Sequence, residues 1–103
     1  MTLRTAGLLS VALFAALTGS AAAADANKGE VLAKRWCAAC HIVSPEQSRG
    51  TTQAPPFAEI ARKPGFDRGL LAYYLLLPHP KMPDMGLTRG EAEDLAAYIA
   101  TQK

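Results

Sequence analysis

The sequence predicts an all-α domain built from three main helices joined by short helical turns and loops. Three observations lead to this prediction. Apolar residues recur at helical spacing in three separate segments. Each segment follows a residue that is well suited to cap a helix N-terminus, namely Asp25, Asp67 or Thr88. The strand–helix–strand pattern of a parallel α/β fold is absent from the sequence.

The first predicted helix covers residues 28–36, with Asp25 and Asn27 as candidate N-caps. Its apolar stripe ends at Trp36, whose large ring is expected to pack in the core. Gly29 lies inside this helix, where glycine costs about 1 kcal/mol relative to alanine. A close approach by another helix would explain why a glycine is tolerated, and the small alanines of the last helix would let that helix approach near Gly29.

Three further helical segments are expected. Residues 57–61 favour one or two short turns. A middle helix over 68–77 is apolar around most of its circumference, so we expect it to pack on more than one side, and Pro78 stops it. The last helix is the best specified, because Thr88 and Glu91 have the spacing of a capping box. Its apolar stripe consists of Ala92, Leu95, Ala96 and Ile99, with Tyr98 at the border.

Residues 1–24 have the pattern of a secretory signal peptide. A basic start at Arg4 is followed by an apolar run over 8–17 and then by small residues that end in Ala22-Ala23-Ala24. The apolar run has only about half the roughly twenty residues that a membrane-spanning helix needs. We therefore expect residues 25–103 to be the mature domain, exported to the periplasm, where cysteines meet an oxidising environment.

The charge of the predicted mature domain is close to neutral. Once Arg4 is set aside, ten Lys and Arg residues face nine Asp and Glu residues. This balance excludes strong attraction to nucleic acid and to an anionic membrane surface. Membrane contact is expected only through membrane-bound partners, electrostatic steering of partners is expected to be weak, and a monomer is expected.

The chain's two cysteines and one of its two histidines form the segment Cys37-Ala38-Ala39-Cys40-His41. Cys-x-x-Cys-His is the attachment signature of a c-type haem. If Cys37 opens a helical turn, Cys40 at i+3 and His41 at i+4 share one face with it. Two thioethers and one axial imidazole are then supplied together.

Other chemistries use a cysteine pair at this spacing. A structural disulfide, a thiol-redox site and half of a zinc site are the alternatives. Zinc would need two further ligands, and His79 is the remaining histidine. A thioredoxin-like site would need the strand-to-helix junction of a βαβ unit.

Two proline-rich stretches complete the candidate site. The carbonyl oxygen of Pro55 is a candidate acceptor for the Nδ1–H of His41, although Pro55 is also readable as a simple turn marker. Residues 78–86 favour an extended loop in which Met82 presents its sulfur to the second side of an iron. Met85, His79 or an open position are the alternatives to Met82.

Together these features resemble the small class I cytochromes c of the bacterial periplasm, and the resemblance covers residues 25–103. It rests on a glycine-bearing first helix, the Cys-x-x-Cys-His segment, Ala54-Pro55, Met82-Pro83 and the final helix. The resemblance implies that Cys37 and Cys40 hold one haem c, that His41 and Met82 are axial ligands and that Pro55 accepts from His41. Mitochondrial-type members place an aromatic residue where this chain has Ala33, and Trp36 is the candidate to fill that space.

The function expected from this reading is one-electron transfer between periplasmic redox proteins, with no catalytic residues and no enzymatic activity. A dedicated cytochrome subunit of a dehydrogenase or reductase is the first alternative. If Met82 is not a ligand, an open iron would instead serve a small-molecule sensor or a peroxidase-like protein. A Cys37/Cys40 dithiol enzyme is the third alternative.

Overall fold

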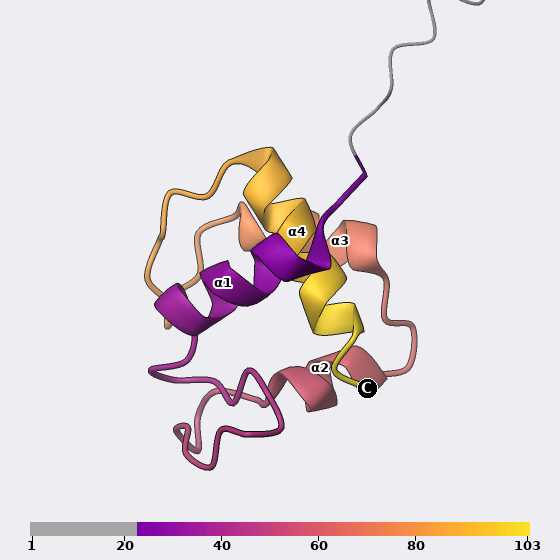
Figure 1. The fold of residues 1–103 in the computed structure, drawn as a ribbon. Helices are drawn as coiled ribbons and strands as arrows, with labels where there is room; N and C mark the ends of the chain where they lie inside the picture. Colours follow the sequence, from indigo (N-terminus) through magenta and orange to yellow (C-terminus); the bar gives the residue numbers. More distant parts are fainter. Residues whose placement is uncertain (1–22) are drawn as a thin grey trace, which may run out of the picture.

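The computed structural model describes residues 23–103, and the predicted signal peptide lies, apart from Ala23 and Ala24, outside the described residues. The described residues form four helices and the loops between them (Figure 1). The helices are α1 (Ala26–Trp36), α2 (Phe57–Arg62), α3 (Arg68–Leu75) and α4 (Arg89–Ala100). The all-α prediction is therefore confirmed. The three longer helices are α1, α3 and α4, and α2 is the short helical element between α1 and α3. None of the helices in residues 23–103 is long and apolar enough to cross a membrane.

The N-termini of three helices are capped by the side chains that the sequence indicated. Asp25 accepts from the backbone N–H groups of Asn27 and Lys28, so α1 begins two residues earlier than predicted and Asn27 lies inside it. Asp67 caps α3 by accepting from Leu70 N–H at 2.8 Å. At α4, Thr88 and Glu91 exchange both bonds of a capping box.

The first and last helices cross at Gly29, and Figure 1 shows α1 lying across α4. A Cβ atom at Gly29 would overlap the carbonyl oxygen of Asp94 and lie 2.8 Å from Cβ of Tyr98. Only glycine allows the two backbones to approach so closely. The start of α1 is tied to the same place, because the Asp25 backbone nitrogen donates to Asp94 Oδ1 at 2.7 Å.

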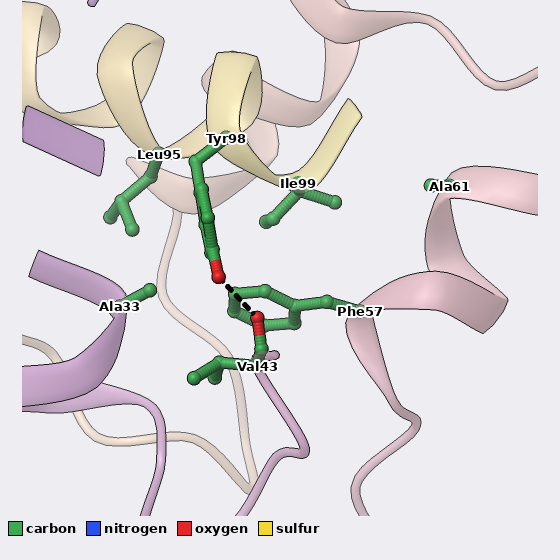
Figure 2. Close-up of a cluster of buried hydrophobic side chains, with 7 residues drawn as sticks. All are labelled: Ala33, Val43, Phe57, Ala61, Leu95, Tyr98 and Ile99. Carbon is green, nitrogen blue, oxygen red and sulfur yellow. Dashed lines mark hydrogen bonds between the residues drawn. The ribbon is translucent and has the colours of Figure 1, made fainter. Parts of the chain in front are cut away.

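The largest buried cluster joins three helices and the loop after Cys40 (Figure 2). α1, α2 and α4 all contribute side chains, and Val43 contributes from the loop. At its centre the hydroxyl of Tyr98 donates to the carbonyl oxygen of Val43 at 2.6 Å, the dashed line in Figure 2. The buried members are Ala33, Val43, Phe57, Ala61, Leu95, Tyr98 and Ile99.

Helix α3 packs on α4 through small side chains. Ala72 meets Ala92 and Ala96, with Leu71 and Leu75 at the margin. The opposite face of α3 is exposed, so this structure does not show the packing on several sides that its apolar composition predicts. The helix also ends two residues before the predicted end, because residues 76 and 77 bond three residues back and Pro78 disfavours helical geometry before it.

The prediction for Trp36 is wrong. Its side chain is 51% exposed and lies outside the core cluster, with the Arg35 guanidinium carbon 6.0 Å from the ring centroid. Ala33 is fully buried among the members of the core cluster, so Trp36 does not fill the space there. Cys37 and Ala38, which follow Trp36, do pack against the core cluster, and Val31 of the same predicted stripe is exposed like Trp36. Trp36 therefore lies on the outer side of α1, and the position of the helix end does not explain its exposure.

Candidate haem attachment site

The Cys37–His41 segment is a helical turn that continues from α1. The backbone N–H of Cys37 bonds to the carbonyl oxygen of Ala33 at 2.9 Å, which carries the helix into the turn. The N–H groups of Cys40 and His41 then both bond to the carbonyl oxygen of Cys37, at 3.1 and 2.9 Å. The turn that the sequence predicts is therefore formed, with Cys40 one turn beyond Cys37 and His41 directly after it.

His41 is held by its predicted partner. Its Nδ1 lies 2.6 Å from the carbonyl oxygen of Pro55. A carbonyl oxygen can only accept, so Nδ1 carries the hydrogen and Nε2 of the neutral ring keeps a free electron pair. An imidazole fixed in this way is prepared to bind a metal through Nε2.

A second contact, which the sequence did not indicate, orients the same ring. Phe57 lies with its ring centroid 5.4 Å from that of His41, and Tyr98 packs edge-on against the other side of Phe57 at 6.3 Å. Phe57 is buried at the start of α2, two residues after Pro55. The loop that supplies the hydrogen-bond acceptor for His41 therefore also supplies an aromatic neighbour.

Gln47 is another residue that the sequence analysis missed. Its Nε2 donates to the carbonyl oxygens of Ala38 and His41, at 3.0 and 2.7 Å, and its Oε1 accepts from Val43 N–H at 3.0 Å. The side chain thus ties the loop after His41 to the turn before it. A glutamine in a polar stretch gives no signal of such a role, because its partners are backbone groups.

The chemistry of Cys37 does not fit a dithiol enzyme. Burial raises the pKa of its thiol to about 11, so the thiol is protonated at neutral pH. Redox-active cysteines of Cys-x-x-Cys motifs have lowered pKa values instead. A zinc site would need four ligands, and residues 23–103 hold no cluster of three or more His, Cys, Asp and Glu side chains placed for a metal.

Met82 lies on a separate loop between α3 and α4. It pairs with His79 in an isolated antiparallel bridge, so residues 79–82 form a tight turn. Met85 belongs to the next turn, in which Asp84 Oδ1 accepts from Gly86 N–H at 2.8 Å and Gly86 has a positive φ of 63°. Both methionine side chains are half-buried, whereas Lys81 at the tip of the first turn is exposed.

No family model matches the chain. A curated relative does: cytochrome c-552 of Bradyrhizobium diazoefficiens is 48% identical over 101 residues, which cover 98% of this chain and 97% of the relative. The chain belongs to the cytochrome c family. No solved structure matches it. The resemblance seen in the sequence is thereby confirmed, and the protein is a small monohaem cytochrome c that carries electrons on covalently bound haem c.

The side chains of this cytochrome fit that group. Cys37 and Cys40 place two thiols on one turn, and the Pro55 carbonyl leaves Nε2 of His41 free to bind iron. The Met82 loop offers a thioether sulfur, the other protein ligand that His-ligated cytochromes c use. The residues needed to attach a haem and to ligate its iron are therefore all present.

Proposed function

We propose that this cytochrome transfers single electrons between redox proteins of the bacterial periplasm, with His41 and Met82 as the axial ligands. When bound, haem c supplies an iron that alternates between the ferrous and ferric states. Cys37 and Cys40 would hold the group through thioethers, and Pro55 would keep the His41 ring in one tautomer and orientation. No residue is required to break a substrate bond.

The observation that carries the proposal is the 2.6 Å contact between His41 Nδ1 and the Pro55 carbonyl oxygen. A carbonyl oxygen can also satisfy a histidine with a purely structural role, but here the histidine directly follows a Cys-x-x-Cys pair on the same turn. A proximal ligand needs this arrangement, because a ring that turns or changes tautomer would alter its bond to iron and with it the reduction potential.

Met82 is favoured over His79 by its surroundings. Its backbone is paired within a closed turn, which limits how far it can move. His79 is the weaker candidate, because its Nε2 is covered by protein. Met/His ligation raises the reduction potential of a haem and closes both sides of the iron, as an electron carrier requires.

The location and the partners belong to the same proposal. The pattern of residues 1–24 supports export to an oxidising compartment, where thioether formation on Cys37 and Cys40 competes with a disulfide. Redox proteins are the partners that a cytochrome c meets, and the near-neutral charge of residues 25–103 favours small, short-lived interfaces and a monomer.

Spectra of the exported holoprotein test the proposal. Met82→Ala should retain covalent haem but lose the Met–iron charge-transfer absorption of the ferric form, and it should bind carbon monoxide rapidly when reduced. Met85→Ala is the matched control, since it removes the other thioether of the loop, and it should behave like the parent protein. A Met82→Ala protein that keeps the absorption would contradict the assignment.

A further inference from the structure

The turn that carries Met82 is closed by backbone pairing. His79 and Met82 are its two ends and are joined by the antiparallel bridge, while Pro80 and Lys81 form the tip. Proline at the second position of a tight turn fixes the backbone φ angle in advance. Whatever holds His79 in place therefore also restrains the backbone of Met82.

His79 is held by an aromatic contact. Its ring centroid lies 4.0 Å from that of Tyr74, and the two ring planes are at 81°. Nε2 of His79 is buried and has no conventional hydrogen-bond partner among the described residues. Nearly perpendicular planes at this distance are the edge-to-face arrangement that aromatic rings prefer, so the contact with Tyr74 restrains the His79 ring.

Tyr74 in turn belongs to a helix that is fixed in the fold. It lies in the last turn of α3, beside Leu75, which packs with Ala72 against α4. Only residues 76–78 separate the end of α3 from His79. The backbone of Tyr74 is therefore fixed by the packing of α3, and its side chain, although 55% exposed, can restrain the turn through its contact with His79.

We propose that the Tyr74–His79 contact positions Met82, so that Tyr74 and His79 are positioning residues for the distal side of the haem. The inference rests on the proposed assignment of Met82 as axial ligand. Helix α3 holds Tyr74, the ring of Tyr74 contacts His79, and His79 is paired with Met82 across the turn. It also gives His79 a role other than that of a competing ligand.

Competition by imidazole for the ferric iron of the exported holoprotein tests this inference. Tyr74→Leu removes the aromatic face, so Met82 should be displaced more easily and imidazole should bind roughly three- to tenfold more tightly, the change expected for losing one aromatic pair. Tyr74→Phe keeps the ring and should restore the parent affinity. Tyr73→Leu alters a neighbouring tyrosine that is 62% exposed, and it should stay within about twofold of the parent.

The urea midpoint of each variant is measured alongside, so that general destabilisation is recognised. Equal imidazole affinities for Tyr74→Leu and the parent would overturn the inference. An equal increase in imidazole affinity for Tyr73→Leu and Tyr74→Leu would overturn it as well. Met82→Ala separates this failure from that of the proposed function. If Met82→Ala loses the charge-transfer absorption while Tyr74→Leu has no effect, only the positioning role is wrong. If Met82→Ala keeps the absorption, both are wrong.

Discussion

At the scale of single residues, the site depends on hydrogen bonds between side chains and backbone carbonyl groups. His41 bonds to the Pro55 carbonyl oxygen, and Gln47 bonds to the carbonyl oxygens of Ala38 and His41. None of these acceptors depends on the identity of its own side chain. A sequence therefore shows which residues carry the chemistry more readily than which residues hold them in position.

Tyr98 is the residue whose hydroxyl bridges the core and the loop after His41. Its O–H donates to the Val43 carbonyl oxygen at 2.6 Å, and burial is the main cause that raises the pKa of this phenol above 10. A raised pKa in the folded state means that folding favours the neutral phenol. This part of the stability is complete below the unfolded pKa, near 10, and is lost as the pH rises through the pKa of the folded state.

We expect Tyr98→Phe to lower the free energy of unfolding by about 1–3 kcal/mol at neutral pH, because it leaves a buried carbonyl oxygen without its donor. The difference from the parent should shrink as the pH rises from about 10 through the pKa of the folded phenol, because the unfolded parent is then deprotonated more than the folded parent. Urea unfolding of the holoprotein across this pH range measures both effects. The exposed Tyr73, changed to Phe, is the control; a deficit for Tyr98→Phe that does not vary with pH would contradict the argument.

At the scale of helices, the crossing of α1 and α4 determines where the haem-binding turn emerges. The turn over residues 37–41 continues directly from α1, so any shift of α1 on α4 moves both cysteines and His41. Gly29 sets the distance between the two helices, since a Cβ atom there would lie 2.6 Å from the carbonyl carbon of Asp94. The distance between α1 and α4 thus depends on the absence of a Cβ atom in glycine.

Gly29→Ala should therefore destabilise the protein although alanine favours helices. We expect a loss of roughly 1–3 kcal/mol in the free energy of unfolding, the usual cost of overpacking, offset in part by the better helix propensity of alanine. Gly90→Ala is the matched control, because Gly90 also lies in a helix and a Cβ there meets nothing within 4 Å. Denaturant unfolding should show Gly90→Ala to be neutral or slightly stabilising, and similar effects at both sites would contradict the close-crossing explanation.

For the molecule as a whole, the sequence predicted what depends on local patterns. The capping box at Thr88 and the turn at Cys37 are short-range features, and the structure confirms both. The contact between Gly29 and α4 was also predicted, because a glycine indicates a close approach and the small alanines of the last helix allow one, and the structure confirms it.

Other contacts between distant parts of the chain were not predictable. The Tyr98 hydroxyl reaches Val43 across 55 residues, and the ring of Phe57 meets His41 only once α2 has packed. Trp36 shows the converse error, since helical spacing suggested a buried stripe through Val31 and Trp36, whereas both side chains are exposed and Ala33 is buried instead. The His79–Tyr74 contact likewise depends on how the chain turns after α3.

The central claim is that His41 and Met82 enclose the iron of an electron carrier, and proton NMR of the reduced holoprotein with labelled methionine methyl groups tests it most directly. Residues 25–103 contain two methionines, Met82 and Met85, so two methyl signals are expected. One signal should lie far upfield, because a ligating methyl sits against the porphyrin ring, and it should persist in Met85→Leu. Two methyl signals at ordinary positions, or an upfield signal that disappears in Met85→Leu, would contradict the account.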